Sequence, residues 1–253
     1  MSAAASIARH LRKYWLSKFA LPMSAHVLPL AEITKGIARP LGTSFAVARL
    51  DHKRSLWATA LHVTGRNDRD LRILYPIVQD VSAYQDTSAP RVRTASVSMI
   101  AADTFHDIAI LEADFSWPED RVPLPLEALD ATQVGEDVDV VGYPHAPDGR
   151  RIVTMQRTQV GAKVILSTAS GVKSKHCVIN LFSRPGQSGS PIISRRSGAI
   201  VAMLIGAHST DHSGFIFGPI NPGELHQTTH AVSAAYIRSM LEGHHEQSTG
   251  KHR

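Results

Sequence analysis

Cysteine, aromatic residues and long apolar runs are all scarce in this sequence. Cys177 is the one cysteine among 253 residues, so no disulfide can form within the chain. This fits a reducing compartment, with the cytoplasm favoured, or a bacterial protein that needs no bridges. Because Cys177 stands in a strand-like run, we expect a small buried apolar residue and not a nucleophile. No window of about 18 uninterrupted apolar residues occurs, so a transmembrane helix is not expected.

The net charge of +5 is placed unevenly along the chain. Residues 1–31 carry Arg9, Arg12, Lys13 and Lys18 and no acidic residue, whereas the remainder is nearly neutral. A nucleic-acid-binding body usually presents a basic face with base-stacking aromatic side chains. Aromatic residues make up only 6% of this sequence. We therefore expect no nucleic acid as the main partner.

The N-terminal segment, residues 1–32, has the pattern of an amphipathic basic helix. Ile7, Leu11 and Phe19 recur at helical spacing with basic residues between them. Such a helix could pack on the domain, contact a membrane surface or act as a mitochondrial-type presequence, and the sequence leaves these roles open. A secretory signal fits poorly, because prolines and a histidine interrupt the apolar stretch after Lys18.

From about Ile37 onward the chain is composed of short runs typical of strands. These runs are rich in Val, Ile, Leu and Thr and are bounded by Gly, Pro or Asp. No helical pattern separates them, which predicts an all-β antiparallel barrel or sandwich. The run SAAYIRSMLEG then predicts a C-terminal helix, and the polar tail after it is expected to be disordered.

A linker-like stretch, WPEDRVPLPLEALDATQ at residues 117–133, divides the strands into two comparable groups. We therefore predict five segments. They are an N-terminal segment (1–32), a first strand group (33–118), a linker (119–132), a second strand group (133–228) and a C-terminal helix with its tail (229–253).

Three fragments carry the residues of a candidate active site. WATALHVT places His62 at the end of an apolar strand, and FHDIAILEA places Asp107 at the start of another. PGQSGSP places Ser188 between two glycines on a tight turn. A serine there is either a simple turn residue or a nucleophile, and a nucleophile needs a histidine base and a carboxylate. Together the three fragments supply such a set.

In this order the fragments resemble the trypsin/chymotrypsin-like serine peptidases, and within them the bacterial HtrA-type branch. The resemblance runs from about Gly42 to Met240. GTSFAV is similar to the opening Gly-x-x-Phe strand of that family, TALH to its Thr-Ala-x-His and DIAIL to its Asp-Ile-Ala-Leu-Leu. VGEDVDVVGYP resembles the Gly-x-Pro strand of the branch, and GQSGSP the Gly-Asx-Ser-Gly-Gly-Pro signature. SGAIVAMLIG and GFIFGPI are similar to the strands that follow the nucleophile.

The resemblance implies two packed six-stranded antiparallel β-barrels, the chymotrypsin-like fold, with the active site between them. His62 would be the general base, Asp107 would orient its imidazole and Ser188 would be the nucleophile. The oxyanion hole would lie at Gly186, Gln187 and Ser188, with the N–H groups of Gly186 and Ser188 as donors. The implied activity is that of a serine endopeptidase acting on protein or peptide substrates through an acyl-enzyme, with no cofactor.

The sequence also departs from the family pattern. Ser190 replaces the second glycine of the signature, and Gln187 cannot supply a carboxylate before the nucleophile. No Ile-Val-Gly-Gly-like start precedes the first strand, so activation by a freed N-terminus is not expected. Because the chain ends soon after its last helix, we expect no PDZ domain. A zymogen-like protease awaiting a protein partner, an enzyme held by an inhibitory partner, and a catalytically silent binding module remain open.

By resemblance, the base of the primary substrate pocket is Phe182, and its wall lies near Met203, Leu204 and Ile205. None of these residues is acidic. We therefore expect a small or apolar residue before the scissile bond and not Arg or Lys.

A metal site is the alternative that the histidines suggest. The pairs His208/His212 and His226/His230 each have i, i+4 spacing, which on a helix could chelate a transition metal. Both pairs lie in polar, Gly- and Ser-containing stretches without a Glu-bearing zinc-protease motif. We expect solvated loop histidines and no metal.

Overall fold

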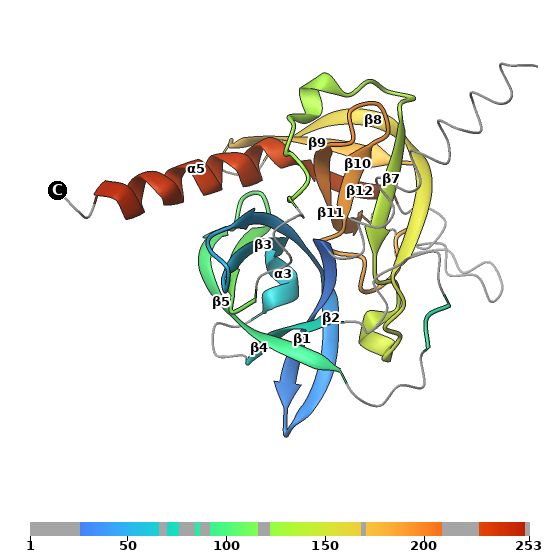
Figure 1. Ribbon diagram of the computed structural model, residues 1–253. Helices are drawn as coiled ribbons and strands as arrows, with labels where there is room; N and C mark the ends of the chain where they lie inside the picture. Colours follow the sequence, from blue (N-terminus) through green and yellow to red (C-terminus); the bar gives the residue numbers. More distant parts are fainter. Residues whose placement is uncertain are drawn as a thin grey trace, which may run out of the picture.

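The computed structural model describes residues 26–65, 70–75, 84–86, 92–115, 122–167, 171–208 and 228–250 (Figure 1). The helix predicted near the N-terminus, the motif GFIFGPI and both His212 and His226 lie outside these residues. Among the helices that are described, none is long and apolar enough to cross a membrane.

Six antiparallel strands in the order β1-β2-β3-β6-β5-β4 close the first barrel. Its opening hairpin turns through Lys35 and Gly36, whose φ angles of 52° and 76° are those of a two-residue turn that matches the twist of the strands. The strands are β1 (Val27–Thr34), β2 (Ile37–Arg49), β3 (Ser55–Ala60), β4 (Leu71–Tyr75), β5 (Arg93–Asp103) and β6 (Ile108–Ala113).

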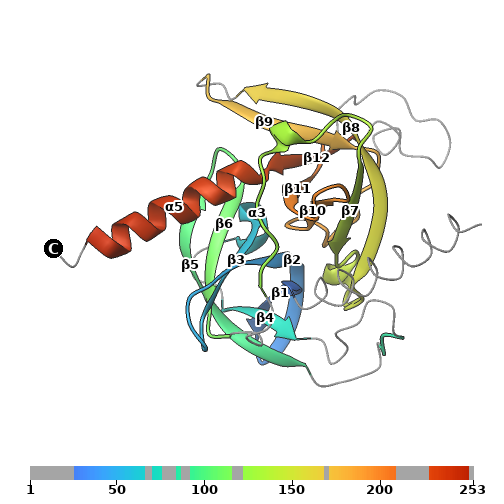
Figure 2. The same ribbon diagram turned by 45° about the horizontal axis from the view of Figure 1, so that its top comes forward.

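The second barrel closes in the order β10-β11-β12-β9-β8-β7, again with antiparallel neighbours. Two closed six-stranded barrels confirm the predicted all-β, chymotrypsin-like fold class. The strands are β7 (Asp137–Gly142), β8 (Thr154–Ser167), β9 (Lys173–Ile179), β10 (Pro191–Ser194), β11 (Ile200–His208) and β12 (Thr228–Ser233). Helix α5 (Ala234–Gly250) follows β12 and passes over the side of the molecule where the two barrels meet (Figure 2).

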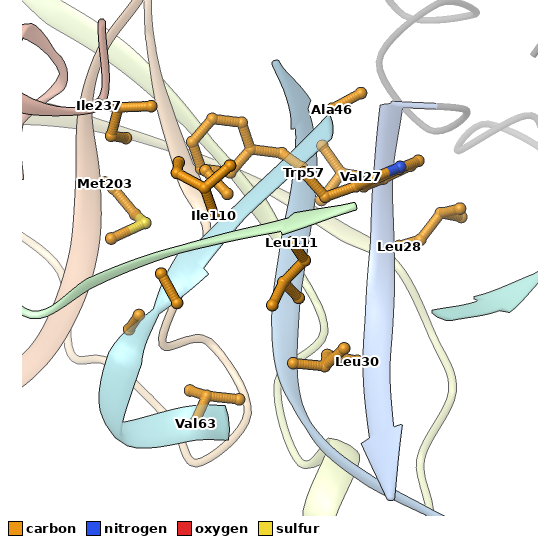
Figure 3. Close-up of a cluster of buried hydrophobic side chains, with 14 of the residues drawn as sticks. Val27, Leu28, Leu30, Ala46, Trp57, Val63, Ile110, Leu111, Met203 and Ile237 are labelled. Atoms are coloured by element: carbon orange, nitrogen blue, oxygen red, sulfur yellow. The ribbon is translucent and has the colours of Figure 1, made fainter. Parts of the chain in front are cut away.

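The larger apolar core is shared between the barrels. Trp57 and Ile110 of the first barrel lie in the same cluster as Met203 of β11 and Ile237 of α5 (Figure 3). All four side chains are buried. Burial of such large apolar groups is the main favourable term in folding, and here it also fixes how the barrels pack. A second, smaller cluster fills the interior of the second barrel.

Two element boundaries differ from those expected. β1 begins at Val27, so the first barrel starts before residue 33, and β12 contains residues 229–233, which the sequence assigned to the C-terminal segment. In both cases the strand is fixed by pairing with distant chain, β1 with β4 and β12 with β9, which local patterns do not reveal. Helix α5 also extends to Gly250, into the stretch expected to be disordered.

Candidate active site

His62 and Asp107 are held together by a strand-to-strand pairing. His62 lies on the short helix α3 (Leu61–Thr64), directly after β3, and Asp107 directly precedes β6, the strand paired with β3. The Asp107 carboxylate accepts the backbone N–H of His62 at 2.9 Å through Oδ1 and contacts ring Nδ1 at 2.5 Å through Oδ2. A carboxylate on Nδ1 places the ring proton there, which leaves Nε2 free to accept a proton.

The backbone at Asp107 is left-handed, with a φ of 57°. Aspartate tolerates this conformation better than most residues, since its short side chain can satisfy nearby backbone groups. The preceding turn is stabilised by Asp103, whose Oδ1 accepts the N–H groups of Phe105 and His106 at 2.9 and 3.1 Å. The turn therefore directs the Asp107 carboxylate back onto α3.

A second His–Asp pair lies on the same turn but faces α5. The ring Nδ1 of His106 is 2.6 Å from Asp103 Oδ2, and the ring stacks on Tyr236 with centroids 3.7 Å apart. Tyr236 in turn accepts the backbone N–H of Lys175 at 2.9 Å through its hydroxyl. These contacts connect the turn that carries Asp107 to α5 and to β9 of the second barrel.

The Ser188 turn is bonded to both barrels. Thr43 of β2 donates its N–H to the Ser188 carbonyl at 2.9 Å and its hydroxyl to the Gly186 carbonyl at 2.8 Å. From the second barrel, the Leu204 carbonyl accepts the N–H of Gly189 at 2.8 Å. Thr43 was not singled out by the sequence, because its role depends on chain 143 residues away.

The same turn lies beside α3, the helix that carries His62. A Cβ added to Gly42 would lie 2.7 Å from Val63 Cγ1 and 3.1 Å from the Ser188 carbonyl oxygen, so both segments converge on this glycine. The Ser188 hydroxyl donates to the Ile205 carbonyl at 3.4 Å, a long hydrogen bond. Within the described residues, no hydrogen bond joins Ser188 Oγ to the His62 ring. The structure therefore brings the three predicted residues to one place, with the Ser–His contact unmade.

Within the part of the chain that the structure describes, the backbone N–H groups of Gly186 and Ser188 donate no hydrogen bond. The N–H of Gln187, between them, donates to the Arg184 carbonyl at 3.0 Å. The N–H of His145 donates to the Pro185 carbonyl at 2.6 Å. Because a trans peptide points its C=O and N–H in opposite directions, this bond turns the Gly186 N–H away from His145.

Glycine is required at position 186. Its φ is 92°, and an added Cβ would lie 2.4 Å from the Tyr143 carbonyl oxygen, far closer than van der Waals contact. Only glycine combines a positive φ with such a close approach of backbone to backbone. The fold therefore explains the first glycine of the GQSGSP motif by local geometry.

The residues expected to form the substrate pocket differ in how far their side chains are exposed. Phe182 is 64% exposed, whereas Met203 and Leu204 are fully buried. Met203 lies in the shared core and Leu204 in the core of the second barrel, so both side chains are directed away from any open pocket. Of the three β11 residues, Ile205 is the one that contacts Ser188, through its carbonyl.

The histidine pairs are not on helices where the structure describes them. His208 ends β11, and His230 lies on the neighbouring strand β12. Among the described residues, no group of three His, Cys, Asp or Glu side chains is arranged to hold a metal ion. Cys177 is fully buried in the core of the second barrel, as expected, and burial raises the pKa of its thiol to about 12.

The paired barrels, with a glycine-bracketed serine beside a His–Asp pair, define a protein of the chymotrypsin-like fold. The sequence profile of the trypsin-like peptidase domain matches residues 42–203, well over half of the chain, and the chain therefore belongs to that family. Among curated proteins, none matches this sequence.

Three solved structures illustrate the shared fold. The MamO protease domain from Magnetospirillum magneticum, in its apo form, is 15% identical with a TM-score of 0.56, and the match covers 88% of this chain and 98% of that one. The active form of the Rv3671c protease from M. tuberculosis is 18% identical with a TM-score of 0.59, covering 90% of this chain and 85% of that one. The inactive form of Rv3671c is also 18% identical, with a TM-score of 0.55 and coverages of 90% and 91%.

Proposed function

We propose that the protein is a serine endopeptidase that hydrolyses peptide bonds of protein or peptide substrates. Ser188 would be its nucleophile, His62 its general base and Asp107 the residue that orients the base. The observation that carries this proposal is the carboxylate of Asp107, which bonds both the backbone and the ring of His62 while Ser188 lies on the adjoining turn.

The proposed chemistry assigns one task to each group. Ser188 Oγ attacks the carbonyl carbon of the scissile bond and its proton passes to His62 Nε2. The carbonyl oxygen becomes negatively charged and is bound by the N–H groups of Gly186 and Ser188. The C–N bond then breaks, the amine leaves with the proton from His62, and an acyl-enzyme remains. Water, deprotonated by His62, repeats the sequence to release the acid and restore Ser188.

One movement must precede this reaction. In the structure the Ser188 hydroxyl donates to the Ile205 carbonyl, and at 3.4 Å this bond is weak. Rotation about the Cα–Cβ bond of the part-buried Ser188 would redirect its hydroxyl to His62.

The unmade Ser–His contact also favours a second candidate, a zymogen-like or silent member of the family. In that case the turn would need a protein partner before Ser188 became reactive, or the fold would serve only to bind peptides. The two candidates differ in whether the isolated protein reacts at Ser188.

For specificity, we propose a small or apolar residue before the scissile bond. None of the four described residues expected to line the pocket, Phe182, Met203, Leu204 and Ile205, is acidic, so they offer a basic substrate residue no ion-pair partner. Cleavage of a peptide library should show Ala, Val or Leu before the cut. Dominance of Arg or Lys at that position would contradict this part of the proposal.

The activity is tested by labelling with a fluorophosphonate. This probe bonds its phosphorus to an activated serine oxygen and expels fluoride. We expect mass spectrometry to locate the label on Ser188 in the wild type and to find none in Ser188→Ala or His62→Ala. Well-folded wild-type protein that takes no label would overturn the proposal of an active peptidase and favour the second candidate.

A further inference from the structure

We propose that Gln156 is a positioning residue for the turn of residues 184–190, called the oxyanion turn because it carries the proposed oxyanion donors. Gln156 acts through the buried side chain of Gln187. This inference rests on the proposed peptidase function, since it concerns how the donor groups of that site are held. Gln156 lies on β8, 31 residues before its partner, and no local sequence pattern indicates the contact.

Gln187 is fully buried, and almost every polar group that it has is occupied. Its backbone N–H donates to the Arg184 carbonyl at 3.0 Å, and its own carbonyl accepts the N–H of Ser190 at 2.9 Å. Side-chain Oε1 accepts the N–H of Arg184 at 2.6 Å, and Nε2 donates to Gln156 Oε1 at 2.6 Å. The side chain thus bonds to the start of the same turn, at Arg184, and to strand β8 of the second barrel, at Gln156.

The direction of each bond follows from chemistry. The backbone N–H of Arg184 can only donate, so the Gln187 atom facing it must be the amide oxygen. The amide nitrogen of Gln187 therefore faces β8, and it needs an acceptor there. Gln156 supplies that acceptor. Without it a buried donor would be unsatisfied, at a cost that would favour rearrangement of the turn.

The turn needs such a tie because its own backbone is permissive. Gly186 and Gly189 both adopt positive φ, and glycine reaches many other conformations at little cost. The direction of the N–H groups of Gly186 and Ser188 therefore depends on the contacts that hold the turn, which are the bonds from Thr43 and His145 to its carbonyls and the side-chain bonds of Gln187. Gln187 lies between those two donors, so fixing its side chain restrains both peptides.

Gln156 is well placed to be the fixed end of this contact. Its backbone pairs with Val140 of β7, a fully buried strand residue, so the acceptor stands on a closed barrel and not on a loop. The contact also joins two neutral groups, and Gln156 is only half-buried, so a carboxylate oxygen in its place would keep contact with solvent.

The test compares three variants on one strand. Gln156→Leu removes the acceptor while keeping the approximate size of the side chain, and Gln156→Glu keeps an oxygen that can accept from Gln187. Gln159→Leu is the matched control, because Gln159 is an exposed residue of β8 whose amide donates to Asp137 at 3.1 Å instead. The readouts are the fluorophosphonate labelling rate, the kcat and KM for p-nitrophenyl acetate, and hydrogen exchange of the peptide spanning residues 184–190.

We expect Gln156→Leu to lower the labelling rate and kcat about tenfold with KM little changed, because loss of a direct oxyanion donor costs about 10²–10³-fold and a supporting contact costs less. Gln156→Glu and Gln159→Leu should stay close to the wild type. Exchange in residues 184–190 should become faster in Gln156→Leu alone. A structural defect without effect on the site would lower the melting temperature but leave kcat per labelled site unchanged.

The outcomes separate this inference from the proposed function. If the wild type labels and Gln156→Leu labels equally fast, the positioning role is wrong and the peptidase function stands. If the wild type does not label, the peptidase function is wrong, and exchange decides the role of Gln156. Faster exchange in Gln156→Leu would then still show that it holds the turn, and unchanged exchange would overturn that as well.

Discussion

His176 should make the stability of the protein depend on pH in the acid range. It lies on β9, is 4% exposed and makes a hydrogen bond of 2.7 Å between its Nε2 and Ser174 Oγ. Its Nδ1 is buried and has no hydrogen-bond partner among the residues that the structure describes. Burial, and then the nearby His230 and His106, lower the pKa of His176 from 6.5 to about 4.

The sign of the effect follows from which state binds the proton. Between pH 6.5 and 4 the unfolded chain protonates His176 and the folded protein does not, so acid favours unfolding in this window. The contribution of neutral His176 to the free energy of unfolding is fully present above pH 6.5 and is lost as the pH falls towards 4. A pKa lowered from 6.5 to about 4, at about 1.4 kcal/mol for each pH unit, corresponds to about 3 kcal/mol.

Urea unfolding of the wild type and of His176→Gln at about pH 7.5 and about pH 4 measures this quantity. Other groups titrate in the same range, so the informative number is the difference between the two proteins. Glutamine keeps hydrogen-bonding capacity at the site but does not titrate. The wild type should lose about 3 kcal/mol more than the variant on acidification. Equal losses would refute the assignment of this pH dependence to His176.

Two further predictions concern the turn that carries Ser188 and the carboxylate of Asp107. Gly189→Ala should destabilise the protein by more than about 2 kcal/mol in thermal unfolding, because its Cβ would lie 2.0 Å from the Thr43 carbonyl oxygen at a φ of 86°. Gly135→Ala is the control for backbone strain alone, having the same φ and no atom within 4 Å, and a loss as large as that of Gly189→Ala would contradict the steric explanation. Asp107→Asn should keep the left-handed backbone but lower kcat about 10⁴-fold, because an amide in place of the carboxylate favours the wrong tautomer of His62. A loss of less than about tenfold would show that the carboxylate does not orient the base.

Local sequence patterns predicted an all-β fold, and the resemblance of three fragments to the trypsin-like family singled out His62, Asp107 and Ser188. Each of the three stands next to a strand of strong apolar character, but local patterns do not show that the three lie together. His62 follows the fully buried strand β3, and Asp107 precedes β6, its partner in the barrel. The glycines around Ser188 mark a turn whose geometry only glycine can adopt.

The orientation of side chains along β11 was not predictable in the same way. Met203 and Leu204 were expected beside the substrate, but each faces a different core because successive residues of a strand point to opposite sides. When both faces of a strand are covered by protein, neither residue is left to line a pocket. The sequence shows that a strand is apolar, but it does not show what covers each face.

The sequence by itself determined the order of the strands along the chain, the turn at Ser188 and the types of residue available for chemistry, because these depend on neighbours in the chain. Tertiary structure alone decided that Thr43 and Gln156 bond to the turn that carries Ser188, and that His106 stacks on Tyr236. The contacts that hold the turn join residues 31 and 143 positions apart. They exist only after two barrels have closed and packed, since closure is what brings distant strands within hydrogen-bonding distance.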